Sequence, residues 1–289
     1  MIRIGIIGAS GVVGQYLTEH LRKNHFDVIP LSRNPKIAGY TRFSPGTDNW
    51  RILGKLDVLI NCAGIIRESK ATDFFDAHVQ LVKNIVSSRE ILGNPKIIHF
   101  SVLGADESNP IAFLKSKGVG DLVLKNIPET YILRPSIICL PNNPLVQKLK
   151  LFLYMGRLML NRPPVPKGFL VTKIQPVMAA DVAECVEKIA LHGWSNQIIP
   201  CAGPEAISFK DLIDMSSSGR GKKTMPVEIP KSLVEPITKN FISVWFPEIL
   251  SYDQFQLLFK DNVDTSFYLN KILGRSPHST IYFWRKELA

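Results

Sequence analysis

The chain has few cysteines and no long uninterrupted apolar run, and both absences narrow what it can be. Of its 289 residues four are cysteines, and none stands in a Cys-x-x-Cys pair. Cys62 and Cys139 lie inside apolar runs, which favours buried thiols over disulfides or metal ligands. No apolar run is long enough to span a bilayer, and residues 1–3 lead directly into a strand-like run without the features of a signal peptide. We therefore expect a protein of a reducing, cytoplasmic compartment, with no metal site.

Acidic residues are outnumbered by basic ones. The sequence has 25 Asp and Glu against 35 Lys and Arg, a formal net charge of +10 at pH 7. Such an excess of basic residues favours binding to anionic partners, although a net charge that keeps the protein soluble is the simpler explanation. The densest basic run, Gly219-Arg220-Gly221-Lys222-Lys223, is short and is predicted to be a loop. Because no nucleic-acid-binding motif is present, we expect no nucleic-acid partner.

Three glycines at a spacing of three residues form the most informative pattern. Gly8, Gly11 and Gly14 follow the apolar run 2–7, which is typical of a buried parallel strand, and precede apolar residues at helical spacing. Gly8 would permit a tight turn, Gly11 would let a phosphate approach the backbone, and Gly14 would let the helix pack closely on the strand. The positive end of that helix would then face a pyrophosphate. The residues expected to contact the cofactor here are Gly8, Ser10, Gly11, Val12, Val13 and Gly14.

Strand-like and helical patterns alternate through the first half of the chain. Strands are predicted over 27–32, 58–64, 96–101 and 130–135, and helices over 74–86 and 113–125. This alternation predicts an α/β fold, a Rossmann-type doubly wound parallel sheet. After residue 140 prolines divide the chain into short pieces. We therefore expect a dinucleotide-binding core over 1–140 and a smaller, mainly helical C-terminal lobe over 141–289, partly interleaved with the core.

Several details of the helices can also be predicted. In helix 74–86 the apolar residues Phe75, Val79, Val82 and Val86 should form one stripe. Helices are further expected over 180–191 and 208–215, with Asp181 and Ser208 as N-caps.

The end of the second strand bears on the choice of dinucleotide. NAD-binding sites commonly place a carboxylate there to bind the ribose 2′-hydroxyl. This chain has Ser32 and Arg33 and no acid at that point. An arginine can pair with a 2′-phosphate, and the hydroxyls of Ser10 and Ser32 could add donors. The sequence thus favours NADP(H), with NAD(H) as the alternative; a solvated surface cation is the plainer explanation of Arg33.

The order of the motifs resembles that of the extended and atypical short-chain dehydrogenases/reductases. The glycine turn is followed by Asn61-Cys62-Ala63-Gly64, by Phe113-x-x-x-Lys117 and by Arg134-Pro135-Ser136. The resemblance implies that Asn61, Ala63 and Gly64 lie along the adenine-side phosphate and ribose, and that Pro135 and Ser136 lie beside the nicotinamide. It also implies that Ser101 and Lys117 contact the cofactor.

Further segments make the resemblance more specific. They are 113–120, 128–136, 174–177, 180–183, 201–205 and 253–263. Together they are similar to the nucleotide-binding accessory subunits of respiratory complex I, of the alpha-subcomplex subunit 9 type, and to their bacterial relatives. This resemblance implies an assembly such as complex I as a partner, with peripheral contact to the inner membrane or a place on the mitochondrial matrix side.

The chain departs from that pattern at the positions that handle protons. Active members use a tyrosine as general acid four residues before the lysine, and that position holds Phe113, which has no titratable proton. The position of the usual catalytic Ser or Thr holds Leu103. We therefore assign no catalytic residue. The histidines His78, His99 and His192 have no partner at metal-ligand spacing and are expected to be structural.

Three functions remain open from the sequence. The first is a protein that binds NADP(H) without catalysis or with weak catalysis, as part of a larger assembly. The second is an NADP(H)-dependent oxidoreductase for a carbonyl, enone or quinone. The third is a redox-sensing regulator. The basic and apolar segment 148–160 could contact a membrane surface or a partner helix, or could pack within the C-terminal lobe.

Overall fold

The structure, a computed structural model, describes residues 1–34, 39–141, 143–195, 197–217, 224–242 and 250–288. The basic run 219–223 therefore lies outside the described residues. The chain divides into two compact units. The first comprises Met1–Pro135, Ala179–Cys201 and Ser266–Pro277, and the second comprises Ser136–Met178, Ala202–Thr265 and His278–Ala289. The chain thus returns twice to the first unit after leaving it.

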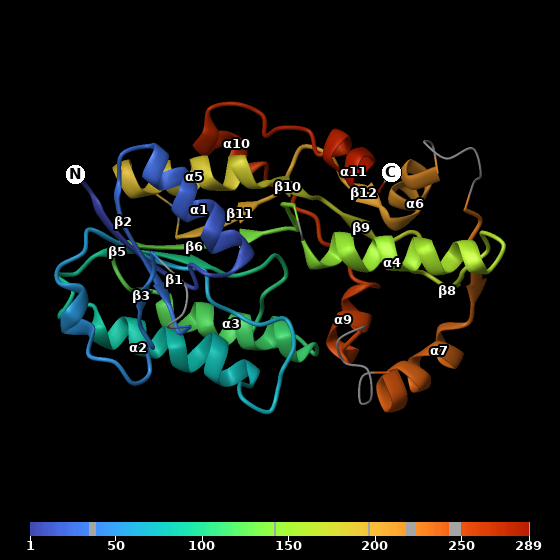
Figure 1. The fold of residues 1–289 in the computed structure, drawn as a ribbon, viewed down its shortest axis with the longest axis horizontal. Coiled ribbons are helices and arrows are strands. Elements are labelled where there is room, and N and C mark those ends of the chain that lie inside the picture. The colour runs from blue at the N-terminus through green and yellow to red at the C-terminus, as the bar shows by residue number, and fades with distance from the viewer. Residues whose placement is uncertain (35–38, 142, 196, 218–223, 243–249, 289) are drawn as a thin grey trace. The chain divides into compact units, whose positions relative to one another are not determined.

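The first unit is built on a seven-stranded sheet in which all neighbouring strands are parallel (Figure 1). The order is β11-β6-β5-β4-β1-β2-β3. The strands are β1 (Arg3–Ile7), β2 (Asp27–Ser32), β3 (Thr41–Arg42), β4 (Val58–Asn61), β5 (Lys96–Phe100), β6 (Thr130–Pro135) and β11 (Ile198–Cys201). From β1 the chain fills one side of the sheet and then the other, which leaves a switch point beside β1. The predicted doubly wound α/β sheet is confirmed.

Helices cover both faces of this sheet (Figure 1). One face carries α1 (Val12–Lys23), α5 (Ala179–His192) and α10 (Tyr268–Leu273), and α5 packs on both others. The other face carries the π-helical turn η2 (Asp76–Gln80), α2 (Leu81–Ser88) and α3 (Ala112–Leu124). The short 3-10 helix η1 (Trp50–Leu53) precedes β4. Both faces of the sheet are therefore buried, as the near-continuous apolar strands require.

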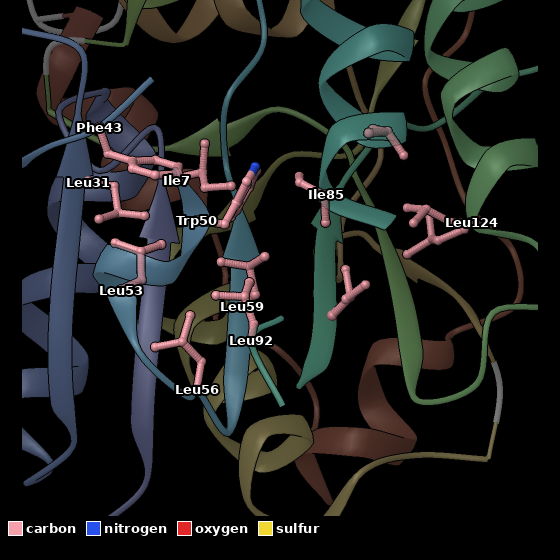
Figure 2. Packing of buried hydrophobic residues seen from close by; sticks show 13 residues of the cluster. Ile7, Leu31, Phe43, Trp50, Leu53, Leu56, Leu59, Ile85, Leu92 and Leu124 are labelled. Carbon is pink, nitrogen blue, oxygen red and sulfur yellow. The ribbon is translucent and has the colours of Figure 1, made fainter. Parts of the chain in front are cut away.

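A cluster of buried side chains joins the strands to α2, α3 and η1. Figure 2 shows its members projecting toward one another from the strands, from these helices and from the segments that connect them. Phe43 and Trp50 meet edge to face with ring centroids 4.9 Å apart, a favoured aromatic geometry. The labelled members are Ile7, Leu31, Phe43, Trp50, Leu53, Leu56, Leu59, Ile85, Leu92 and Leu124.

Two predictions about the helices are wrong. Phe75 was expected on the buried stripe but is 52% exposed, while Phe74 is buried instead. The π-helical turn η2 explains this, because its wider turn shifts the register of the buried face. Asp181 is not an N-cap: α5 begins at Ala179, and Asp181 lies in its first turn, fully buried, with its carboxylate 2.9 Å from the Arg275 guanidinium.

The second unit combines helices with pairs of very short strands. Its helical elements are α4 (Pro144–Leu158), α6 (Phe209–Ser217), α7 (Lys231–Ile237), the π-helical turn η3 (Thr238–Ile242), α9 (Tyr252–Leu257) and α11 (Ile281–Leu288). Its strands are β7 (Ile138–Cys139), β8 (Pro164–Pro166), β9 (Lys173–Ile174), β10 (Val177–Met178), β12 (Ile207–Ser208) and β13 (Val227–Ile229). They pair as β10 with β7, β12 with β9 and β13 with β8.

The core of the second unit includes Val146, Leu149 and Leu153 of α4 and the fully buried Trp284 of α11. Ser208 caps α6 as predicted: its hydroxyl accepts the Asp211 N–H at 3.1 Å, and its own N–H donates to the Asp211 carboxylate. Over the described part of the chain, no helix combines the length and apolarity that crossing a membrane demands.

Candidate functional site

The glycine turn connects β1 to α1 at the switch point of the sheet. Gly8 has φ +77°, and a Cβ there would lie 2.7 Å from the Ala63 nitrogen, so only glycine fits. A Cβ on Gly14 would lie 2.7 Å from the Ala9 Cα. At Gly11, in contrast, φ is −75° and the nearest atom to an added Cβ is the Gly8 oxygen at 3.3 Å. Packing therefore requires glycine at positions 8 and 14, whereas at position 11 a shift of a few tenths of an ångström of the Gly8 carbonyl would admit a Cβ.

The first turn of α1 presents free backbone donors and no negative charge. Gly11 is its N-cap, provides no side-chain cap, and no acid lies in the first turn. The four N–H groups at such an end lack partners within the helix, and the helix dipole makes the end positive. Val12 is exposed, while Ser10 and Val13 are half-buried. The end of α1 thus has the backbone chemistry of an anion site.

A second group of polar residues lies where β2 and β3 end. Ser32 is buried, and its hydroxyl donates to that of Ser10 at 3.3 Å, which joins β2 to the glycine turn. Arg33 is exposed. Arg42 of β3 is exposed too, and it pairs in register with Ser32. Residues in register on parallel strands face the same side of the sheet. The structure therefore places a second cation beside Ser32.

Sequence reasoning missed Arg42. Its strand is only two residues long and polar, so it carries no periodicity from which a strand could be predicted.

The turn after β4 is held by its own asparagine. The Asn61 side-chain oxygen accepts the Ala63 N–H at 3.1 Å, and its amide donates to Nδ1 of His99 at 3.0 Å. A Cβ on Gly64 would lie 3.0 Å from Lys117 Nζ. The structure thus places Gly64 of this turn next to Lys117, while the contact of these residues with a cofactor stays a prediction.

Lys117 is a buried cation on α3. Its ammonium donates to the Phe100 carbonyl oxygen at 3.0 Å, and its side chain is 5% exposed. Burial lowers the pKa of Lys117 to about 8, against the opposing attraction of Asp121. This lysine therefore carries much of its charge at neutral pH in a poorly solvated place, next to the turn at Gly64.

His78 supports the same turn from η2. Its Nε2 accepts the Ile65 N–H at 3.2 Å, and its Nδ1 pairs with the Ser116 hydroxyl at 2.8 Å. Burial, with the charge of Lys117, lowers the pKa of His78 to about 3, so the imidazole is neutral. The prediction that His78 is a structural histidine is confirmed. Its role in fixing the turn after β4 could not be predicted, because η2 and the turn are adjacent only in the fold.

Phe113 closes the apolar side of this region. It is buried, and its ring centroid lies 5.8 Å from those of both Phe74 and His78. Leu103 is also buried, and its N–H donates to the Pro135 oxygen at 3.1 Å. Neither side chain can donate or accept a proton, so the two positions lack acid–base chemistry in the structure as in the sequence.

Ser101 is engaged with a buried carboxylate. Its hydroxyl donates to Oδ2 of Asp121 at 2.9 Å, and Arg134 donates to the same oxygen through two nitrogens. Oδ1 of Asp121 and Nε2 of His99 have no hydrogen-bond partner among the described residues and lie 3.8 Å apart. Burial lowers the pKa of His99 well below its usual value. His99 is thus only partly satisfied, and the contact of Ser101 with a cofactor stays a prediction.

The two remaining predicted contacts lie at the end of β6. Pro135 is its last residue, and Ser136 begins the second unit, where its hydroxyl donates to the side chain and backbone of Asn262. Their place beside a nicotinamide stays a prediction. Three of the cysteines are buried and Cys62 is half-buried, and none of the four forms a disulfide with another described residue. Burial raises the pKa of Cys139 to about 12, so this thiol is unreactive at neutral pH.

Comparison with known proteins places these features among relatives. No protein-family profile matches the chain. The alpha subcomplex subunit 9 of mitochondrial NADH dehydrogenase (ubiquinone) 1 from Dictyostelium discoideum is 25% identical, over 81% of this chain and 71% of that protein. The mitochondrial NADH-ubiquinone oxidoreductase 40 kDa subunit of Neurospora crassa is 25% identical, over 94% of this chain and 75% of that protein.

Solved structures agree on the fold. A nucleoside-diphosphate-sugar epimerase from Staphylococcus aureus has a TM-score of 0.75 at 16% identity, covering 99% of this chain and all of that one. MoeE5, solved with UDP-glucuronic acid and NAD, has a TM-score of 0.70 at 14% identity, covering 100% of this chain and 96% of that one. RMD from Pseudomonas aeruginosa, solved with NADPH, has a TM-score of 0.67 at 16% identity, covering 100% of this chain and 98% of that one. The chain therefore has the fold of these solved proteins and resembles in sequence the mitochondrial subunits of NADH dehydrogenase and NADH-ubiquinone oxidoreductase named above.

Proposed function

We propose that this protein binds a nicotinamide dinucleotide at the carboxyl end of its parallel sheet, with the pyrophosphate over the glycine turn. The observation that carries the proposal is the contrast among the three glycines. Backbone contacts under 3.0 Å explain Gly8 and Gly14, but at Gly11 an added Cβ would meet one backbone oxygen at 3.3 Å, which only a small shift would relieve. A ligand that must approach the backbone closely accounts for the third glycine. MoeE5 and RMD, which share the fold, were solved with NAD and NADPH.

The preferred dinucleotide in this proposal is NADP(H). Arg33 and Arg42 are both exposed at the ends of β2 and β3, and Ser32 and Ser10 supply hydroxyls beside them. Two guanidinium groups would pair with a 2′-phosphate, whereas a ribose 2′-hydroxyl gains little from them. Titration calorimetry should show tighter binding of NADPH than of NADH, and Arg42→Ala should weaken NADPH about tenfold while leaving NADH unchanged. An equal loss of affinity for NADPH and NADH would show that Arg42 does not contact the 2′-phosphate.

The bound dinucleotide serves a structural or regulatory role in this proposal. Phe113 and Leu103 occupy the proton-handling positions with buried apolar side chains. The relatives named above are subunits of mitochondrial NADH dehydrogenase, so we propose that this chain is likewise an accessory protein of a respiratory, membrane-associated assembly. Mild purification should recover it with further chains of that assembly and with bound nucleotide.

A matched pair of variants tests the dinucleotide site. Gly11→Val places a branched side chain where the phosphate would approach, and the extended backbone at Gly11 accepts it. We expect a folded protein that has lost nucleotide binding. Gly14→Val forces a side chain into the Gly8–Ala9 backbone and should lower the free energy of unfolding by about 1–3 kcal/mol or more. A folded Gly11→Val variant that binds NADPH as tightly as the parent would overturn the proposal.

A second function, an NADP(H)-dependent reductase, is favoured by one observation. Lys117 lies beside Gly64, where it would hold the ribose of a bound cofactor. Hydride transfer to an enone or quinone does not require a tyrosine. NADPH consumption across aldehydes, ketones, enones and quinones tests this, with Phe113→Tyr measured in parallel. Substantial turnover by the parent would establish the reductase, and turnover only in Phe113→Tyr would show that the pocket lacks just its acid.

A further inference from the structure

Helix α4 carries apolar side chains on two opposite faces. One face, with Val146, Leu149 and Leu153, is buried in the core of the second unit. At 3.6 residues per turn the opposite face carries a second apolar set. Its members are between 44% and 75% exposed: Leu151, Tyr154, Met155 and Leu158. Packing within the unit therefore explains only half of the apolar character of this segment.

The exposed set continues past the end of the helix. Leu160 is 87% exposed and has φ +55°, a left-handed conformation that is costly for leucine. A distant segment joins it there, because the Met225 N–H donates to the Asn161 oxygen at 2.8 Å, and the Met225 side chain is 59% exposed. We call Leu151, Tyr154, Met155, Leu158, Leu160 and Met225 the α4 apolar surface.

The stretch that supplies five of the six residues of this surface has one sign of charge, whereas the sixth, Met225, is followed by the exposed Glu228. Between Glu129 and Asp181 there is no Asp or Glu, whereas seven residues are Lys or Arg. Arg162, Lys167 and Lys173 of this stretch are exposed. Of the two lysines on α4 itself, Lys148 donates to the neutral amide of Gln254, and Lys150 pairs with Glu287 at 2.9 Å. Apart from Met225, the exposed apolar side chains and these exposed cations thus come from one acid-free stretch.

We propose that the α4 apolar surface is a peripheral membrane-binding site for anionic lipid. Protruding leucines would enter the boundary between headgroups and acyl chains, and the cations would pair with lipid phosphates. A second copy of this chain is the poorer occupant, because it would bring the same cations against one another. The proposal rests on the second unit alone and does not depend on the dinucleotide.

Vesicle sedimentation of the full chain tests the proposal. The probes are vesicles of phosphatidylcholine alone and vesicles containing about 30% phosphatidylglycerol. We expect the parent to sediment only with the anionic vesicles, and to be released as the salt is raised. Leu158→Glu with Leu160→Glu should reduce the bound fraction at least about tenfold. These side chains are largely exposed, so the variant should fold, which its NADPH binding and circular dichroism check.

The matched control places the same charges elsewhere. Ile52→Glu with Ile91→Glu changes two exposed isoleucines of the first unit and should bind vesicles as the parent does. The proposal would be overturned if the parent did not sediment with anionic vesicles, or if the Leu158/Leu160 variant sedimented with them to the same extent as the parent. A parent dimer in light scattering that only the Leu158/Leu160 variant abolishes, or an acidic protein that the parent binds in place of lipid, would also overturn it.

Discussion

The buried ammonium of Lys117 gives this fold a measurable dependence of stability on pH. Within the described part of the chain its Nζ has one acceptor, the Phe100 oxygen at 3.0 Å, and burial lowers its pKa from 10.5 to about 8. Each unit of difference in pKa between the folded and the unfolded chain is worth about 1.4 kcal/mol. Keeping the charge buried therefore costs about 3 kcal/mol of folding free energy. Lys117→Met removes the charge, keeps the length of the side chain, and leaves the Phe100 oxygen without this donor.

The sign follows from proton linkage. Between pH 8 and 10.5 the unfolded chain holds a proton on Lys117 that the folded chain has released, so this group makes stability rise with pH. Below pH 8 its cost is present in full. The lost hydrogen bond in Lys117→Met costs about 1–3 kcal/mol at every pH. The stability of the parent relative to the variant should therefore increase by about 2–3 kcal/mol from pH 7 to pH 10.

Urea unfolding of both proteins at pH 7, 8, 9 and 10 measures this difference and cancels the other titrating groups. Lys115→Met, an exposed lysine on the same helix, is the matched control and should follow the parent. A difference between parent and Lys117→Met that stays constant over this range would refute the burial argument.

Further predictions concern the cofactor and the buried ion pairs. Arg33→Asp should abolish or reverse the preference for NADPH over NADH in titration calorimetry, because an anion would then face the 2′-phosphate; an unchanged preference would exclude Arg33 from that site. Arg275→Ala removes a partner of the fully buried Asp181 and should lower the free energy of unfolding in urea by about 2–4 kcal/mol. Asp121→Asn takes the counter-charge from Arg134 and should cost a similar amount, about 2–4 kcal/mol, by the same assay; a loss near zero in either variant would mean that water replaces the missing partner.

Much of the sheet could be predicted from the sequence because its strands are buried on both faces. Such strands are continuous apolar runs, and the predicted bounds of β2 and β6, 27–32 and 130–135, are those of the structure. The position of the glycine turn could also be predicted, because the φ angle and the backbone contacts of Gly8 admit no other residue there. Where the local pattern and the tertiary packing disagreed, packing decided the outcome. At η2 the buried side chain is that of Phe74, not that of Phe75 as the pattern predicted.

The sequence by itself determined the parallel sheet, the position of the glycine turn and the absence of a proton donor at Phe113, because each depends on residues adjacent along the chain. Only the tertiary structure decided which distant residues meet. It set Arg42 beside Ser32, held the turn after β4 with His78, and brought Met225 to the end of α4. These contacts are made through backbone pairing and burial between segments far apart in sequence, and no periodicity within one segment encodes them.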